Sequence, residues 1–318
     1  MELDGQESSN IEDRRGDSGG GGFGGGGFGG GGFGGGGFGG GIPIPLGGGL
    51  FKGGFGLIAI VVISLILGVN PLTLLGGFVD GGGGSYVAPQ TQQRTASRPT
   101  TNDPEERFIA RVLKSTEDVW GSQFQQMGRQ YKQPRLVLFR GQTQTACGAG
   151  QAAMGPFYCP PDQRVYIDLS FFDELSQRFH APGQFPQAYV VAHEVGHHVQ
   201  NLLGIEAKVS QLRDNMSKRD ANAMSVRVEL QADCLAGVWA YHASRDPDAK
   251  LKLTDQDVEQ AINAATSIGD DTLQKQAQGR IVPDSFTHGS SAQRVRWFKI
   301  GLDNGDIRRC DTFNAKQL

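Results

Sequence analysis

The sequence has no excess of basic residues and no closely spaced cysteine pair. It contains 30 Lys and Arg residues against 33 Asp and Glu residues, which gives a net charge of −3 at pH 7. Nucleic-acid-binding domains carry a basic patch and a high pI, so we expect no nucleic-acid partner. The absence of any Cys-x-x-Cys pair argues against a zinc site built from cysteine thiolates.

Charged residues are also absent from one long stretch of the N-terminal third. The 27 residues between Lys52 and Asp80 carry no charge, and their centre is rich in Leu, Ile and Val. A membrane-spanning helix needs about 20 mostly apolar residues, so we predict one helix over residues 54–76, in contact with the lipid bilayer. The glycine-rich flanks offer nothing that would bury a core helix. The stretch also starts too far into the chain for a cleaved signal peptide.

Charges and cysteines predict which side of the membrane each part occupies. Lys52 precedes the apolar stretch and Asp80 follows it, which by the positive-inside rule places the N-terminus in the cytoplasm and residues 80–318 outside. All four cysteines lie beyond the stretch, and an even number in an exported domain fits two disulfides. Four cysteines allow three pairings, and four buried free thiols are the alternative.

Composition divides the chain into four parts. Residues 1–53 contain a Gly-Gly-Gly-Gly-Phe repeat and are expected to form a disordered cytoplasmic tail, because so much glycine cannot offset the entropy lost on ordering. The predicted membrane helix over residues 54–76 is followed by a flexible linker over residues 77–103. Residues 104–318 have the patterning of one α+β domain, whose first helix is capped by Asp103. Strands are predicted at 135–139 and 165–169, and further helices at 171–179, 186–203, 208–243, 255–267 and 291–302.

Residues 193–197 read His-Glu-Val-Gly-His, which is the spacing of a helical metal site. On a helix, His193 and His197 lie one turn apart on the same face, so one tetrahedral metal ion can take both imidazoles. Glu194 would reach a metal-bound water without binding the metal, as in zinc hydrolases. His198 is a poor substitute for His197, because its direction differs from that of His193 by about 140°. The alternative is two histidines that only form hydrogen bonds in a core.

A third protein ligand is expected from an apolar helical run further along the chain. Glu229 and Asp233 share one face of that run, one turn apart. Carboxylates in so apolar a helix are unfavourable unless they are paired or bound to a cation. We therefore predict that Glu229 binds the metal and that Asp233 accepts the free ring N–H of a ligand histidine. Two salt-bridged acids on a partly exposed helix are the alternative.

With these motifs, residues 103–318 resemble the bacterial neutral zinc metallopeptidases of the YpfJ-like type, which show the gluzincin pattern of Glu-x-x-Ala-Asp after His-Glu-x-x-His. The resemblance implies a compact gluzincin-like fold, with two zinc-bearing helices beneath a small antiparallel sheet whose edge strand would bind substrate. It also fits a single-pass protein of the bacterial inner (cytoplasmic) membrane, with its catalytic domain periplasmic or extracellular. The matching stretches are residues 145–148, 155–160, 165–172, 193–200, 229–237 and 287–294.

The cysteines are predicted to pair as Cys147–Cys159 and Cys234–Cys310. The first pair closes a short glycine-containing loop with little apolar content to hold it otherwise, which stabilises by about 3 kcal/mol in the chain-entropy model. The second pair would join the C-terminal segment to the predicted zinc helix, because Cys234 directly follows Asp233.

Residues 287–294 read Thr-His-Gly-Ser-Ser-Ala-Gln-Arg. They resemble the Thr-His-Pro-x-x-x-x-Arg motif of another membrane-associated gluzincin group, with Gly289 in place of the proline. The resemblance implies that His288 assists the transition state and that Arg294 braces the site, and we predict that Arg294 pairs with Asp233 or with another acid of the site. The alternative is that His288 caps the following helix and Arg294 is a surface cation.

Taken together, these patterns predict a membrane-anchored endopeptidase with one Zn²⁺ per chain, acting on a peptide or protein substrate. Zinc on His193, His197 and Glu229 would lower the pKa of bound water to about 7, and Glu194 would act as the general base. Two other functions stay open. One is a non-catalytic, zinc-stabilised peptide-binding or scaffold module, and the other is a zinc amidase that acts on cell-wall material.

Overall fold

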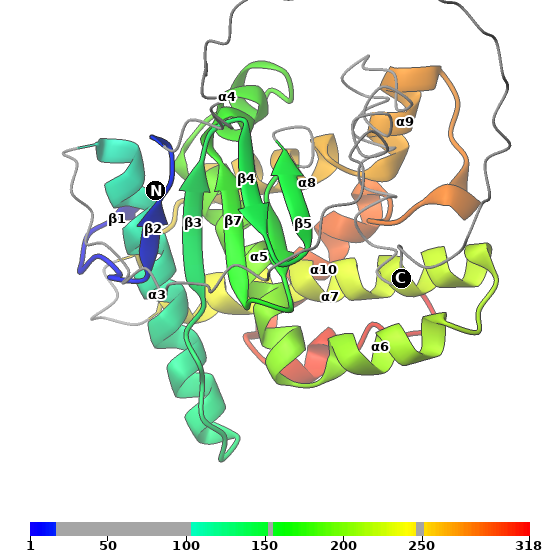
Figure 1. The fold of residues 1–318 in the computed structure, drawn as a ribbon, viewed down its shortest axis with the longest axis horizontal. Helices are drawn as coiled ribbons and strands as arrows, with labels where there is room; N and C mark the ends of the chain where they lie inside the picture. The colour runs from blue at the N-terminus through cyan, green and yellow to red at the C-terminus, as the bar shows by residue number, and fades with distance from the viewer. Residues whose placement is uncertain (17–102, 152–154, 246–250) are drawn as a thin grey trace, which may run out of the picture.

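The computed structural model of the chain describes residues 1–16, 103–151, 155–245 and 251–318 (Figure 1). The predicted membrane helix over residues 54–76, the Gly-Phe repeat and nearly all of the predicted linker lie outside the described residues. Within the described ranges, no helix has both the length and the apolar character needed to cross a membrane.

The described part of the chain has the predicted α+β fold, and most of its regular structure is helical. Its first long helix begins where the sequence predicted, since the Asp103 side chain accepts a hydrogen bond from the backbone N–H of Glu105. The α-helices are α3 (Pro104–Gln126), α4 (Leu169–Gln177), α5 (Gln184–Leu202), α6 (Ile205–Arg213), α7 (Lys218–Ala243), α8 (Asp255–Ser267), α9 (Asp270–Gln278) and α10 (Ser291–Asn304). The 3₁₀ helices are η2 (Pro283–Ser285) and η3 (Ile307–Cys310), and the strands are β1 (Glu2–Leu3), β2 (Ile11–Asp13), β3 (Arg135–Phe139), β4 (Gln142–Thr145), β5 (Gly148–Gln151), β6 (Phe157–Cys159), β7 (Arg164–Asp168) and β8 (Leu251–Lys252).

The largest described sheet has four strands in the order β2-β3-β7-β6. Strand β3 is parallel to both β2 and β7, and β6 is antiparallel to β7. The prediction of an antiparallel sheet was therefore wrong. The chain reaches β7 from β3 through the hairpin β4–β5 and through β6, and this crossover allows β3 and β7 to run in the same direction.

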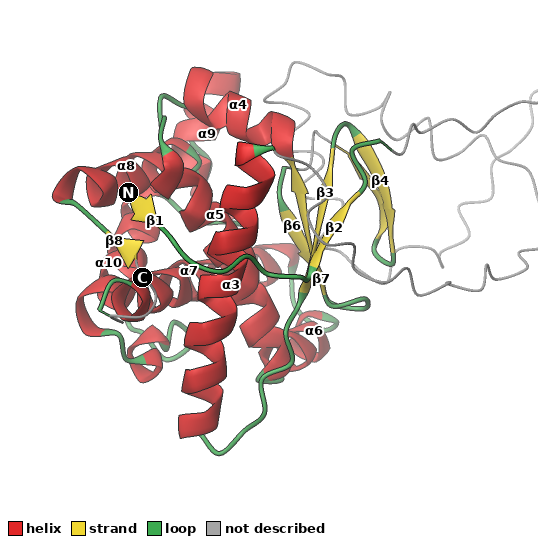
Figure 2. Ribbon diagram, turned by 90° about the vertical axis from the view of Figure 1, so that its left-hand side faces the viewer, coloured by secondary structure: helices red, strands yellow, loops and turns green. Residues whose placement is uncertain are grey.

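Alternation along β3 divides the apolar side chains between the two faces of the sheet. Leu136 and Leu138 belong to the main helical core, whereas Val137 and Phe139 pack in a smaller cluster with Tyr166. Figure 2 shows the helices on one side of the sheet and β4 on the other. Helix α5, which carries His193 and His197, contacts β6 and β7 of this sheet.

Residues 1–16 are part of this domain and do not form the disordered tail that the sequence analysis predicted. Ile11 is fully buried in the main core, and β2 pairs with β3. The guanidinium of Arg15 forms ion pairs with Asp103 and with the buried Glu106 at the start of α3. The structure of this segment could not be predicted from its polar composition, because Ile11 packs against residues that lie more than 90 positions further along the chain.

The pairing of β2 with β3 bears directly on the predicted membrane topology. A single crossing between residues 54 and 76 would place residues 1–16 and 103–318 on opposite sides of the membrane. The hydrogen bonds of the sheet need both segments on the same side. One chain therefore cannot both cross the membrane once between these segments and pair β2 with β3. Measuring whether residues 1–16 belong to the domain decides between the two.

Helix α7 passes through the centre of the helical layer and packs closely against α5 and α10. A Cβ atom on Gly301 of α10 would lie 1.9 Å from the carbonyl oxygen of Cys234 on α7, so only glycine allows this approach. The disulfide Cys234–Cys310 joins α7 to η3, and Cys147–Cys159 joins the turn of the β4–β5 hairpin to β6. Both pairings are the predicted ones.

The single helix predicted over residues 208–243 is in fact two helices. Helix α6 ends at Arg213, and α7 begins at Lys218 after the N-cap Ser217, whose hydroxyl accepts a hydrogen bond from the backbone N–H of Asp220. The cap allows the chain to reverse, so that α6 contacts both α5 and α7.

Candidate metal centre and active site

Helix α5 presents the two histidines of the motif on one face. The rings of His193 and His197 lie with their centroids 4.9 Å apart and their planes nearly perpendicular. Apolar side chains on the other faces of the helix are buried in the core, among them Val191, Val195 and Val199. This packing fixes the helix and leaves its polar face directed toward α7.

Glu229 on α7 completes the set of three predicted ligands. Its Oε2 atom lies 3.2 Å from Nε2 of His193 and 3.6 Å from Nε2 of His197. Among the residues that the structure describes, these three form the one group of His, Cys, Asp or Glu with ligand atoms that all lie within 4.8 Å of one another. Bonds of about 2 Å to one tetrahedral zinc ion place its ligand atoms roughly 3.3 Å apart, so the donor set fits zinc.

The close approach of α5 and α7 depends on Gly196, which lies between the two histidines. A Cβ atom at this position would lie 3.0 Å from the carbonyl oxygen of Ala232 and 3.2 Å from its Cα atom. The lack of a side chain at Gly196 therefore allows α5 and α7 to approach closely beside the site.

Asp233 orients His193, one turn beyond Glu229 on α7. Its Oδ1 atom lies 2.8 Å from Nδ1 of His193. Burial by itself would raise the pKa of the Asp233 carboxyl. Arg294 and His193 have the larger, opposite effect, and the pKa falls to about 2. An ionised carboxylate only accepts hydrogen bonds, so Nδ1 of His193 carries the proton and Nε2 is left free for a metal.

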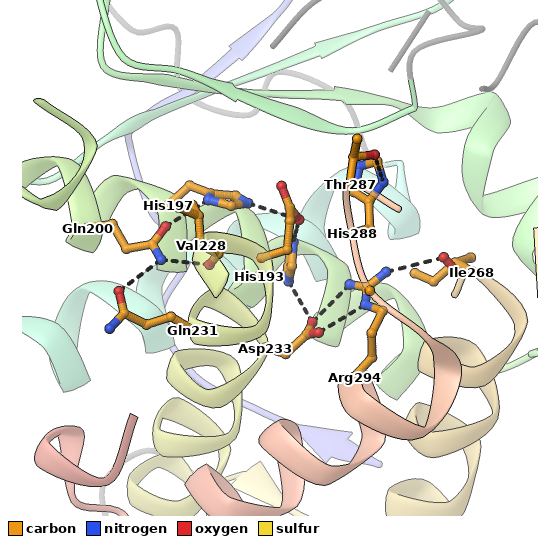
Figure 3. Close-up of polar contacts among 12 residues, drawn as sticks. His193, His197, Gln200, Val228, Gln231, Asp233, Ile268, Thr287, His288 and Arg294 are labelled. Atoms are coloured by element: carbon orange, nitrogen blue, oxygen red, sulfur yellow. Dashed lines mark hydrogen bonds and ion pairs between the residues drawn. The ribbon is translucent and has the colours of Figure 1, made fainter. Parts of the chain in front are cut away.

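Arg294 reaches Asp233 from α10, as the sequence predicted. Its Nε donates to Oδ2 of Asp233 at 2.9 Å and one terminal nitrogen donates to Oδ1 at 2.8 Å (Figure 3). The hydroxyl of Tyr189 also donates to Asp233 Oδ1, at 2.5 Å, and accepts from Arg294. Tyr189 lies one turn before His193 on α5, and no sequence motif indicated its role. A buried ion pair is favourable only when its remaining polar atoms are satisfied, and Tyr189 contributes to that.

Gln200 orients His197 and was also missed. Its Oε1 atom lies 2.8 Å from Nδ1 of His197, while its Nε2 donates to the carbonyl oxygen of Val228 at 2.8 Å and to Oε1 of Gln231 at 3.0 Å (Figure 3). Both amide hydrogens are thus used on α7, which fixes Oε1 as the acceptor for the imidazole. Glu206 of α6 lies behind the same ring, with Oε1 3.9 Å from Nδ1.

Glu194 follows the first ligand on α5 and is buried, with 7% of its surface exposed. Burial raises the pKa of its carboxyl, and the neighbouring His193 and His197 oppose that shift without overcoming it. A carboxylate with a raised pKa beside a metal site has the property that a general base needs, because it accepts a proton readily at neutral pH.

The loop before α10 carries His288 to the edge of the site. Its imidazole contacts Asp270 and Thr287, and the charge of Glu229 acts on it. Gly289 has a φ of +94°, a conformation that proline cannot adopt, so the departure from the Thr-His-Pro pattern has a conformational reason.

The other histidines lie apart from the ligand set. The ring nitrogens of His198 lie near the Tyr158 hydroxyl and the carbonyl oxygen of Lys132, and burial lowers its pKa to about 4. His242 contacts Gln123 and the carbonyl oxygen of Gly305.

Comparison with known proteins agrees with the geometry. The model of a family described as putative neutral zinc metallopeptidase matches residues 2–313. This chain belongs to that family. It is 48% identical over 309 residues to the uncharacterized protein YpfJ of Escherichia coli K12, covering 97% of this chain and 96% of that protein. It is 46% identical over 195 residues to the uncharacterized protein Rv2575 of Mycobacterium tuberculosis, covering 59% of this chain and 65% of that protein.

No solved structure matches the chain. Membership in the neutral zinc metallopeptidase family supports a zinc peptidase, and the group formed by His193, His197 and Glu229 is where the residues of this chain fit the metal. The family match begins at residue 2, so it includes β1 and β2, in agreement with their place in the domain.

Proposed function

We propose that the protein is a zinc-dependent endopeptidase that hydrolyses peptide bonds with Glu194 as the general base. The observation that carries this proposal is the convergence of three ligand atoms, Nε2 of His193, Nε2 of His197 and Oε2 of Glu229. Catalytic zinc sites use three protein ligands and keep a further position for water, whereas structural sites are closed by four. In the described residues, no fourth His, Cys, Asp or Glu joins the group.

Zinc held by these residues supplies a Lewis acid that makes water nucleophilic at neutral pH. Glu194 accepts a proton from the attacking water and returns it to the nitrogen of the leaving amine. Asp233 and Gln200 keep Nδ1 of the two imidazoles protonated, so that both Nε2 atoms stay directed at the metal.

His288 is proposed to donate a hydrogen bond to the oxygen that becomes negative in the transition state. Burial lowers the pKa of this imidazole, but Glu229 and Asp270 raise it more, to about 9. This pKa is that of the metal-free chain; a ring protonated on both nitrogens can donate from Nε2, and a cationic donor stabilises a developing oxyanion. Edge strand β6 is proposed to pair with the extended substrate, because β6 contacts α5 and has β7 on one side only within the described sheet.

The two disulfides support a further proposal, that the domain works in an oxidising compartment outside the cytoplasm. Attachment to the bacterial cytoplasmic membrane is proposed through residues 54–76, on the apolar character of their sequence alone; with β2 paired to β3, this attachment would have to leave residues 1–16 and 103–318 on the same side of the membrane.

Cleavage of a mixed peptide library by the full zinc-loaded chain tests the proposal. We expect internal cleavage by the wild type, cleavage slower by at least about 100-fold in Glu194→Gln, and one zinc per chain in both. Products that carry only terminal cuts would contradict an endopeptidase. No peptide cleavage by the zinc-bound wild type would contradict the proposal, and release of peptides from cell-wall material by the same sample would then favour the amidase.

A further inference from the structure

Asp270, the first residue of α9, holds the loop that carries His288. Its side chain is almost fully buried. One carboxylate oxygen, Oδ2, accepts hydrogen bonds from three successive backbone N–H groups, at 2.7 Å from Thr287, 2.7 Å from His288 and 3.0 Å from Gly289. Successive N–H groups of this kind form a concave anion site, and here an internal carboxylate fills it.

The second oxygen of the same carboxylate faces the imidazole. Oδ1 of Asp270 lies 3.3 Å from Nδ1 of His288, and the hydroxyl of Thr287 lies 3.0 Å from the same nitrogen. A carboxylate only accepts, so the proton of that contact belongs to Nδ1. The ring is thereby oriented with Nε2 left for another partner.

The loop is also fixed against the helix that carries Glu229. The backbone N–H of Asp270 donates to the carbonyl oxygen of Gly289 at 2.9 Å, which closes the loop onto α9. A Cβ atom on Gly289 would lie 3.2 Å from side-chain atoms of Val226 and Leu230 on α7. Residues 287–289 are therefore held between α9 and α7, with Leu230 directly after the metal ligand.

We propose that Asp270 is a positioning residue of the active site, which holds His288 in the orientation that presents Nε2 to the substrate. This proposal rests on the proposed function, because His288 then acts on the oxyanion and Asp270 acts only through His288. A purely structural role, in which Asp270 only closes the loop, is the competing explanation.

The substitution Asp270→Asn separates the two explanations. The amide oxygen of asparagine still accepts the backbone N–H groups, but its NH₂ group cannot accept the proton of the imidazole. The neighbouring Asp271→Asn is the matched control. Oδ1 of Asp271 accepts from the backbone N–H and the hydroxyl of Ser291, both at 2.8 Å, so it closes the same loop without contacting His288.

Kinetics of the full zinc-loaded chain on a fluorogenic peptide from the library give the first readout. We expect kcat of Asp270→Asn to fall about 10-fold to 100-fold, as for other residues that orient a catalytic group, with KM within twofold of the wild type. Asp271→Asn should keep kcat within twofold. The double variant Asp270→Asn/His288→Ala should be no slower than His288→Ala alone, because Asp270 acts through the imidazole. The proposal would be overturned if kcat of the double variant fell by the product of the two single-variant losses. Equal kcat values for Asp270→Asn and Asp271→Asn would also overturn it.

A spectroscopic readout is independent of turnover. In ¹H–¹⁵N spectra of the zinc-loaded chain, the Nδ1–H signal of His288, assigned by its loss in His288→Ala, should be retained in Asp271→Asn and lost or shifted in Asp270→Asn. An unchanged signal in Asp270→Asn would contradict the proposal. If the zinc-bound wild type cleaves no peptide, the proposed function fails and this spectrum still decides whether Asp270 orients His288.

Discussion

Nδ1 of His197 lies 2.8 Å from Oε1 of Gln200, three residues further along α5. Gln200 is fully buried, and its amide group donates to the carbonyl oxygen of Val228 on α7, the residue before Glu229. One side chain thus orients a predicted metal ligand and joins the two helices that carry the predicted ligand set.

Replacing Gln200 by alanine should weaken zinc binding about 10-fold to 100-fold, which is the usual effect of removing the partner of a ligand histidine. Competition with a chromogenic chelator measures the dissociation constant. Gln123→Ala is the control, because Gln123 is also buried but contacts His242, away from the site. Equal zinc affinity in the two variants would show that Gln200 does not orient His197.

A methyl group at Gly196 should separate α5 from α7. The added Cβ atom would lie 3.0 Å from the backbone oxygen of Ala232, and overpacking of this kind lowers the free energy of unfolding by about 1–3 kcal/mol. Zinc affinity should fall as well, because the ligands come from both helices. Gly121→Ala in α3 is the control, since its Cβ atom would meet nothing within 4 Å and alanine favours a helix by about 0.5–1 kcal/mol. Urea unfolding curves that rank the two variants the other way would contradict this packing.

Zinc binding should release protons and become tighter as the pH rises. Burial lowers the pKa of His197, but Glu229 and the other nearby carboxylates raise it more, to about 10 in the metal-free protein. His197 is therefore protonated at pH 7 and must lose its proton to bind a metal. We expect zinc affinity to rise about tenfold per pH unit for each proton released between pH 6 and 8. Calorimetry in buffers with different ionisation enthalpies counts the protons, and a count of zero at pH 7 would contradict the coupling.

The substitution Ile11→Ala tests whether residues 1–16 belong to the domain. Ile11 is fully buried, so its truncation should lower the free energy of unfolding by about 2–5 kcal/mol. The exposed Gln6→Ala is the control and should change stability by less than about 0.5 kcal/mol. If Ile11→Ala were as stable as the wild type, residues 1–16 would not be packed in the domain. The predicted disordered tail would then hold, together with the topology that places the two segments on opposite sides of a membrane.

The sequence predicted that His193, His197 and Glu229 lie together because its signals are local. His193 and His197, like Glu229 and Asp233, lie one helical turn apart, and the helical period places each pair on one face. Arg294 and the two disulfides also lie where they were predicted. Gln200 was missed although it follows His197 by three residues, a spacing that already places it within reach of the imidazole.

Other features depend on partners distant in the sequence. Asp270 contacts a loop 17 to 19 residues further along the chain, and nothing near it in the sequence indicates a role. Strand β2 contains one apolar residue among acids, and only the surface offered by β3 makes it a strand. The mixed direction of the sheet likewise follows from how β2, β3 and β7 meet in space, which periodicity along one segment cannot show.

The most direct test of a zinc peptidase with Glu194 as its base compares metal content and cleavage in the wild type and Glu194→Gln. Glutamine keeps the shape of the side chain but cannot accept a proton from water. We expect both proteins to contain one zinc per chain, and peptide cleavage by Glu194→Gln to be slower by at least about 100-fold, the usual contribution of a general base. Cleavage at the wild-type rate by zinc-loaded Glu194→Gln would contradict the account.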